Sequence, residues 1–154
     1  NLSGASINDR HFLEFIERQF AYSQVSPQKI CFEITETIAI ANLDQAAKFI
    51  QSLKQVGCSF ALDDFGKGMS SLSYLTNLPV DYLKIDGMFI KKMEKDTVTQ
   101  GIVEGIHHIG KAMNLKVIAE YIETESILNK ISSLGIDYGQ GFYLDKPSPL
   151  LLSV

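Results

Sequence analysis

Apolar positions along the chain alternate between two patterns. Short, nearly continuous apolar runs cover residues 29–34, 58–62, 82–86, 116–120 and 136–138, and such runs are typical of strands buried on both faces of a sheet. Between them, apolar residues recur every three or four positions, which is the spacing of one face of a helix. The chain is therefore expected to alternate strands with amphipathic helices.

The helical segments carry recognisable start and stop signals. We predict helices at about residues 9–22, 42–57, 96–113 and 124–135, and a short helix before Pro79. Thr124 is a suitable N-cap, and Gly57 and Gly135 stand where two of the helices should end. In the helix at 96–113, the spacing of Ile102 and Ile106 predicts that both face the interior.

The composition is that of a globular domain, with 45% hydrophobic and 21% charged residues. The balance of 14 basic to 18 acidic side chains gives a net charge of −4, which argues against binding to a nucleic-acid polymer or an anionic membrane. No apolar run reaches the roughly 18 residues of a membrane span. Cys31 and Cys58 make neither a disulfide framework nor a zinc cluster, so we expect a cytoplasmic segment.

Strands that alternate with helices imply βαβ units and a parallel sheet, so the predicted fold class is α/β. Two architectures remain, an open doubly wound sheet and a (β/α) barrel. The glycine-rich phosphate loop of a dinucleotide-binding doubly wound fold, G-x-G-x-x-G, does not follow any predicted strand. The choice between the two therefore depends on the residues at the strand ends.

Polar side chains stand at the end of each predicted strand. They are Glu33, Asp63, Asp64, Lys84, Asp86, Glu120 and Gln140. A single aspartate at a strand end is often only a turn residue or a helix cap. On several neighbouring strands, however, such residues would meet in one pocket, because the carboxyl ends of barrel strands converge on one face. We therefore predict a TIM-barrel-like (β/α)8 fold.

Four carboxylates of this set, Glu33, Asp63, Asp64 and Glu120, point to a metal site. Crowded together, they would repel one another and raise each other's pKa unless a cation lay among them. Hard oxygen ligands in this number suit Mg²⁺ or Mn²⁺ rather than zinc. The adjacent Asp63 and Asp64 could hold two ions about 3.5–4 Å apart, the usual clamp for hydrolysis of a phosphodiester. Lys84 could orient the attacking water or stabilise charge on the phosphate.

The same residues stand in motifs that resemble those of a known family. The motifs are Glu33-Ile34-Thr35-Glu36, Asp63-Asp64-Phe65-Gly66, Leu83-Lys84-Ile85-Asp86, Ala119-Glu120 with Glu123, and Gln140-Gly141. In this order they resemble the EAL domain, the bacterial phosphodiesterase module for cyclic di-GMP. The opening Asn1-Leu2-Ser3 resembles that family's asparagine motif, so the resemblance covers essentially all of residues 1–154.

The resemblance implies a set of metal ligands. Asn1, Glu33 and Asp63 match ligands of a first metal ion. Asp63 as a bridge, together with Asp64 and Glu120, matches the surroundings of a second ion. The implied cofactors are Mg²⁺ or Mn²⁺, two per complete site.

The resemblance also implies catalytic and substrate-binding roles. The catalytic group would be Glu120, Lys84, Glu36 and Glu123. Glu120 is a candidate general base, Lys84 matches the lysine near the attacking water, and Glu36 matches the glutamate that anchors the loop after the paired aspartates. Glu123 would support this group, while Gln140 and Asp86 are assigned to the substrate pocket. The implied reaction is hydrolysis of one phosphodiester bond of cyclic di-GMP to linear pGpG.

The family is often joined to GGDEF or sensory domains, so we expect a longer bacterial signalling protein, which could be anchored in a membrane through its other domains. The alternative function is a catalytically silent module that binds cyclic di-GMP or serves dimerisation. An intact Glu-Ala-Leu strand upstream would favour the enzyme over this alternative.

Three features depart from the family pattern. The Glu-Ala-Leu signature, whose glutamate is a metal ligand in the family, occurs nowhere in the chain. A complete barrel takes about 250 residues, so we expect the C-terminal two-thirds of a domain with about six of eight strands, counting residues 1–3. Its open edges favour a homodimer, and alone it should be a poor enzyme.

The other two departures are residue replacements. Lys67 and Met69 replace a small hydroxyl residue and an aromatic residue, and Tyr121 replaces a common glycine.

Overall fold

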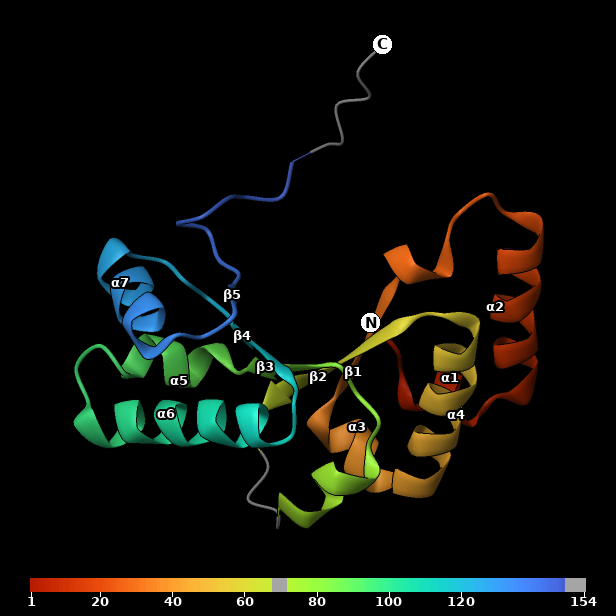
Figure 1. Ribbon diagram of the computed structural model, residues 1–154, viewed down its shortest axis with the longest axis horizontal. Coiled ribbons are helices and arrows are strands. Elements are labelled where there is room, and N and C mark those ends of the chain that lie inside the picture. Colours follow the sequence, from red (N-terminus) through yellow and green to blue (C-terminus); the bar gives the residue numbers. More distant parts are fainter. Residues whose placement is uncertain (68–71, 149–154) are drawn as a thin grey trace.

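The computed structural model describes residues 1–67 and 72–148, and its centre is a single parallel sheet (Figure 1). The strands are β1 Cys31–Thr35, β2 Ser59–Phe65, β3 Tyr82–Ile85, β4 Lys116–Ala119 and β5 Tyr138–Gly139. Each strand pairs with the next one along the chain. A doubly wound sheet reverses its order at a switch point, whereas a barrel adds strands in one direction. The observed order confirms the barrel-type α/β fold.

Helices connect the strands and surround the sheet. They are α1 Gly4–Asn8, α2 Arg10–Tyr22, η1 Pro27–Lys29, α3 Glu36–Ala41, α4 Leu43–Val56, η2 Leu72–Asn77, α5 Gly87–Lys92, α6 Thr97–Ala112 and α7 Glu125–Leu134. In Figure 1, α1, α2 and α4 lie to the right of the strands and α5, α6 and α7 to the left. Among the described residues, no helix has the length and apolar character needed to cross a membrane. Met69, which departs from the family pattern, lies outside the residues that the structure describes.

The start of the chain differs from its prediction. The described part of the sheet has five strands, because residues 1–3 form no strand beside β1. The Leu2 N–H donates one hydrogen bond of 2.8 Å to the Glu33 carbonyl. Ser3 then accepts from the Ser6 N–H as the N-cap of α1, so the extended segment ends after a single bond to β1. Counting a sixth strand here was wrong.

The helix ends follow the signals in the sequence. Thr124 accepts a hydrogen bond from the Ile127 N–H at the start of α7. Gly57 and Gly135 end α4 and α7 with φ values of 112° and 73°. This left-handed conformation is strained for residues with a Cβ, which explains why glycine occupies both positions.

Helix α6 buries most, but not all, of the apolar side that its spacing predicts. Its buried residues are Thr99, Val103, Ile106, His107 and Gly110. Ile102 is instead 42% exposed, so its predicted inward position was wrong. Gly110 sets the orientation, because it packs so closely on β4 that a Cβ would lie 2.4 Å from Val117 Cγ2. The face of Gly110 is then shared by the residues three, four and seven positions before it, which are His107, Ile106 and Val103. Ile102 does not lie on this face.

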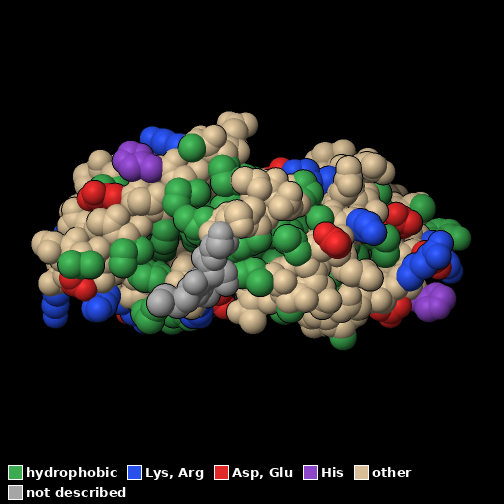
Figure 2. Space-filling view, turned by 90° about the horizontal axis from the view of Figure 1, so that it is seen from below, with side chains coloured by type: hydrophobic (Ala, Val, Ile, Leu, Met, Phe, Trp, Pro, Cys, Tyr) green, Lys and Arg blue, Asp and Glu red, His purple; other side chains and the backbone are tan. Residues whose placement is uncertain are grey.

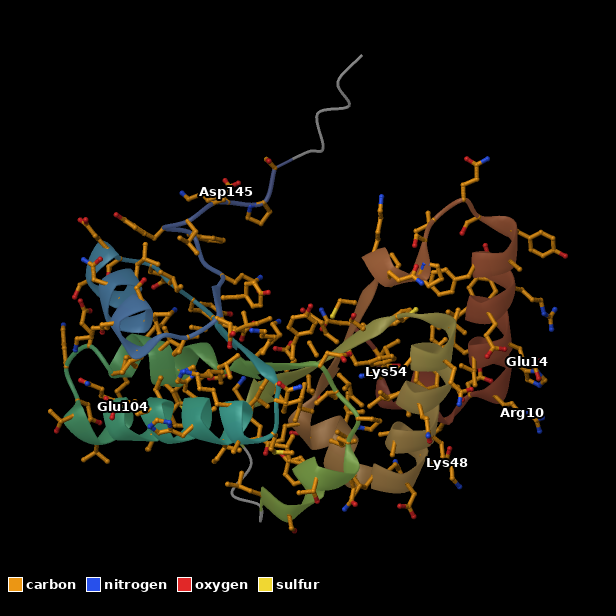
Figure 3. The ribbon with its side chains drawn as sticks, viewed as in Figure 1. Arg10, Glu14, Lys48, Lys54, Glu104 and Asp145 are labelled. Atoms are coloured by element: carbon orange, nitrogen blue, oxygen red, sulfur yellow. The ribbon has the colours of Figure 1, made fainter. Side chains whose placement is uncertain are left out.

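Two aspartates hold the amino-terminal ends of neighbouring strands together. Asp81, just before β3, accepts from the Phe60 N–H of β2 at 2.9 Å and from the ammonium of Lys54. Lys54 lies on the side of α4 that faces the strands (Figure 3). Asp137, just before β5, repeats the arrangement by accepting from the Val117 N–H of β4 at 3.0 Å. Both contacts fix the register of their strands at the end opposite to the polar strand ends.

Charged and apolar side chains occupy different parts of the surface. In the face shown in Figure 2, hydrophobic side chains gather near the middle, and most charged side chains lie toward the two ends. Arg10 and Glu14 lie on the outer side of α2 (Figure 3), where they form an exposed ion pair of 3.7 Å. Such exposed pairs contribute little to stability, so the buried apolar residues between sheet and helices stabilise the fold.

Replacing Gly110 by alanine should destabilise the protein, because the new Cβ would overlap Val117 unless α6 moves away from β4. We expect the free energy of unfolding to fall by about 1–3 kcal/mol, as in other overpacked cores. Gly105 of the same helix is the control, since a Cβ there meets none of the described residues within 4 Å. Gly105→Ala should raise that free energy by about 0.5–1 kcal/mol. Urea unfolding measures the free energy of unfolding of both variants. If the two substitutions changed it by the same amount in the same direction, the close packing of α6 on β4 would be contradicted.

His107 should make stability depend on pH. Neither ring nitrogen has a hydrogen-bond partner among the described residues, and burial lowers the pKa of His107, with a further lowering by Lys111. The unfolded chain therefore binds the proton more readily, so stability is lost as the pH falls through about 6.5. His107→Leu should reduce this loss and raise the free energy of unfolding by about 1 kcal/mol at pH 7. The same change at the exposed His108 is the control, and an unaltered pH profile for His107→Leu would contradict the assignment.

Candidate active site

Two consecutive aspartates share one side of the sheet because β2 contains a bulge. Between two regular pairs of β2 and β3, Asp63 and Asp64 together lie opposite the single residue Lys84. Asp64 has a left-handed φ of 57°, which accommodates the extra residue. In a regular strand, consecutive side chains point to opposite faces. Here carboxylate oxygens of both aspartates and of Glu120 lie within 4.8 Å of one another.

The ammonium of Lys84 lies among the strand ends. Its Nζ is 3.0 Å from Glu33 Oε1, 3.0 Å from Asp63 Oδ1 and 2.9 Å from Glu120 Oε1. The Lys84 side chain is only 4% exposed, so water screens these ion pairs weakly. One buried cation therefore joins residues from β1, β2 and the segment after β4, and brings together four of the residues that the sequence singled out.

Burial and hydrogen bonding shift the pKa values of this cluster. Burial acts to lower the pKa of Lys84, but hydrogen bonds to its three carboxylate partners outweigh this effect, so the pKa lies above its ordinary value. Burial raises the pKa of Glu120, and Lys84 opposes this effect while Asp63 and Asp64 add to it. Because Lys84 carries one positive charge and contacts three carboxylates, this part of the cluster keeps an excess of negative charge.

The donor set fits a divalent metal ion. The oxygens of Asp63, Asp64 and Glu120 are close enough for one ion to contact all three. They are hard ligands of the kind that Mg²⁺ and Mn²⁺ prefer, and an ion would neutralise the excess charge. Glu33 joins the cluster through Lys84, and Asn1 lies next to the residue that hydrogen-bonds the Glu33 carbonyl.

A second lysine lies beside Asp64, in a contact that no motif or spacing in the sequence predicted. Lys67 Nζ is 2.7 Å from Asp64 Oδ1 and 2.6 Å from Asp86 Oδ2. Asp86 is the N-cap of α5 and accepts from the Met88 N–H at 2.8 Å. Burial acts to raise the pKa of Asp86, but the hydrogen bonds from Lys67 and Met88 lower it. Asp86 is buried, and the Lys67 ammonium contacts one of its carboxylate oxygens.

Glu36, the first residue of α3, connects the end of β2 to η2. Its Oε2 accepts from the Gly66 N–H at 3.1 Å, and its Oε1 accepts from the Tyr74 hydroxyl at 2.6 Å. Both Glu36 and Tyr74 are buried, and burial together with this hydrogen bond raises the pKa of Tyr74. Glu36 thus holds the segment that follows Asp64. Tyr74 was missed, because a contact across 38 positions leaves no local signal in the sequence.

A cavity of about 350 Å³ opens next to the acidic cluster. Its lining residues are Glu120, Tyr121, Glu123, Gln140, Gly141, Phe142, Asp145 and Pro147. The Gln140 N–H donates to the Ala119 carbonyl and the Gln140 carbonyl accepts from the Ile122 N–H, which joins the end of β5 to the segment after β4. The structure therefore brings three predicted site residues, Glu120, Glu123 and Gln140, to one cavity.

The rim of this cavity is built around an aromatic ring. Tyr121 has a left-handed φ of 54°, and its ring lies so close to Gly87 that a Cβ there would be 2.0 Å from the ring. The Lys91 ammonium lies 4.4 Å from the centre of the ring and 3.2 Å from Glu123 Oε1. These contacts fix the orientation of both Tyr121 and Glu123 beside the entrance.

Together, the fold and the site define a barrel-type α/β protein with a carboxylate cluster suited to divalent metal ions. The family model of the EAL domain matches residues 1–147. The chain belongs to the EAL domain family.

Similar proteins of known name agree with this assignment. The chain is 45% identical over 150 residues to "Cyclic di-GMP phosphodiesterase PdeA" of Borreliella burgdorferi, which is 97% of this chain and 22% of that protein. It is 40% identical over 150 residues to "Cyclic di-GMP phosphodiesterase PdeB" of Shewanella oneidensis, again 97% of this chain and 18% of that protein. The chain thus spans about a fifth of the length of these curated relatives.

Solved structures show the same fold. The structure of "PaMucR Phosphodiesterase, c-di-GMP complex" is similar with a TM-score of 0.91 and 33% identity, over 97% of this chain and 61% of that chain. The calcium and cyclic di-GMP complex of BlrP1 from Klebsiella pneumoniae is similar with a TM-score of 0.82 and 29% identity, over 90% of this chain and 35% of that chain.

Replacing Tyr74 by phenylalanine should destabilise the region after Asp64. The change removes a buried hydroxyl that donates to Glu36, and we expect the free energy of unfolding to fall by about 1–3 kcal/mol. Tyr22→Phe is the matched control, because the side chain of Tyr22 is 85% exposed and its loss of a hydroxyl should change little. Urea unfolding measures the difference, and equal stability of the two variants would contradict the role given to this hydrogen bond.

Proposed function

We propose that this chain supplies the larger part of an active site that hydrolyses cyclic di-GMP to linear pGpG with Mg²⁺ or Mn²⁺. The observation that carries the proposal is the bulge that places Asp63 and Asp64 together beside Glu120, around the ammonium of Lys84. The names of the curated relatives and the cyclic di-GMP in the PaMucR complex support the choice of substrate.

The proposed metal ligands follow from the acidic cluster. Asn1, Glu33 and Asp63 would hold a first ion, and Asp63, Asp64 and Glu120 would hold a second one. Ions held by these residues would supply stabilisation of the negative charge that develops on the phosphodiester during hydrolysis. The calcium in the BlrP1 complex supports a divalent ion in this family.

The remaining residues would position groups and move a proton. Lys84 would fix the orientation of three carboxylates and add positive charge next to the phosphate. Glu120 would accept the proton of the attacking water, with Lys84 favouring its ionised form against the effect of burial. Gln140, which lines the cavity beside Glu120, would contact the nucleotide, and Glu123 on the same cavity would support the catalytic group. Glu36 would act by holding the segment after Asp64.

We further propose that the chain works as part of a longer protein. The chain covers about a fifth of the length of the curated relatives, so the longer protein could also contain GGDEF or sensory domains and the Glu-Ala-Leu strand. The site would then lie on the cytoplasmic side, where cyclic di-GMP signals, and the domain would form a homodimer. The chain by itself would hydrolyse the substrate poorly, because one ligand of the complete site stands outside it.

Asp63→Asn and Glu33→Gln in the longer protein should each reduce cyclic di-GMP hydrolysis by more than about a hundredfold, because each removes a negative charge from the metal ligands. Lys84→Ala should also lower the rate, because it removes the cation that orients three of the carboxylates. The measurement is formation of pGpG with Mg²⁺ or Mn²⁺, alongside calorimetry of metal binding.

Asp44→Asn is the control for these variants, since it makes the same chemical change at an exposed site on α4. Full activity of Asp63→Asn would contradict the metal assignment. Binding of cyclic di-GMP by the longer protein without turnover would instead identify a silent receptor. Absence of both binding and turnover would leave dimerisation as the function.

A further inference from the structure

The ammonium of Lys67 lies between two carboxylates that have different surroundings. The contact with Asp64 is 2.7 Å long and the contact with Asp86 is 2.6 Å long. Asp86 is 6% exposed and is fixed by the Met88 N–H at the start of α5. Asp64 is 37% exposed and lies on the bulge, with an oxygen in the cluster formed with Asp63 and Glu120. Lys67 thus links a fixed carboxylate to one that belongs to the metal site.

We propose that Lys67 is a positioning residue that sets the affinity of the Asp64 side of the site for divalent cations. Its ammonium competes with a metal ion for the carboxylate of Asp64, and it stays paired with Asp86 when the ion binds. This inference rests on the proposed function, because it assumes that Asp64 is a metal ligand. It goes beyond that function by giving the site an internal competitor for its metal.

The arrangement makes displacement of Lys67 easy. Its side chain is 49% exposed, and an exposed ion pair costs little to break. The buried Asp86 keeps a charged partner after the ammonium leaves Asp64, so no buried carboxylate is left without a counter-ion. Lys84 differs from Lys67 in its exposure and in its partners, because it is 4% exposed and surrounded by three carboxylates. Lys67 should therefore weaken metal binding without preventing it.

The test is Mn²⁺ binding to the longer protein, with free Mn²⁺ measured by electron paramagnetic resonance and the heat of binding by calorimetry. Lys67→Met and Lys67→Gln should tighten the weaker Mn²⁺ site by about tenfold, because each removes one competing charge. Lys67→Arg retains the charge and should restore weak binding. Lys116→Met is the matched control, since Lys116 is also exposed and pairs with an aspartate at 2.7 Å, but at the opposite end of the sheet.

Equal Mn²⁺ affinity in the wild type and both neutral Lys67 variants would overturn the inference. So would an equal change in Lys116→Met, which would mean that net charge alone is responsible. Hydrolysis of cyclic di-GMP, measured on the same samples, separates the two proposals. Tighter Mn²⁺ binding without hydrolysis would support the role of Lys67 and contradict the proposed function, whereas hydrolysis with unchanged Mn²⁺ affinity would overturn the role of Lys67 alone.

Discussion

The ion cluster around Lys84 is the interaction on which the site depends. Glu33, Asp63 and Glu120 come from β1, β2 and the segment after β4, and their negative charges would repel one another if no cation lay among them. A single buried ammonium holds the three side chains within hydrogen-bonding distance. Because it neutralises only part of their charge, the same contact that stabilises the strand ends also leaves a site that attracts a divalent ion.

The bulge in β2 determines what that site can hold. A regular strand would turn Asp64 away from Asp63, and the acidic cluster would lose one of its three carboxylates. The extra residue instead keeps both aspartates on the side of Glu120. It also places Asp64 within reach of Lys67, so one local irregularity of the backbone underlies both the acidic cluster and its contact with Lys67.

Signals that are local in sequence were sufficient to predict the fold class, the helix ends and the strands that carry the polar residues. Most of the errors involve contacts between distant segments, whereas the error at the start of the chain involves a local helix cap. Ile102 fits a helical period, but the close packing of Gly110 on β4 decides which face is buried. The extended start of the chain resembles a strand until Ser3 caps α1. Tyr74 and Lys67 find their partners only after β2, β3 and their connections are in place, so no spacing rule could reveal them.

The aspartates that precede β3 and β5 have a consequence for how the protein can vary in evolution. Asp81 and Asp137 fix strand register at the end of the sheet remote from the acidic cluster, through the Phe60 and Val117 N–H groups. A shift of two residues would move a side chain by about 6.6 Å along its strand and remove it from the cluster. Because alignment is secured at the opposite end, the loops beside the acidic cluster can accept substitutions without moving the strands out of register.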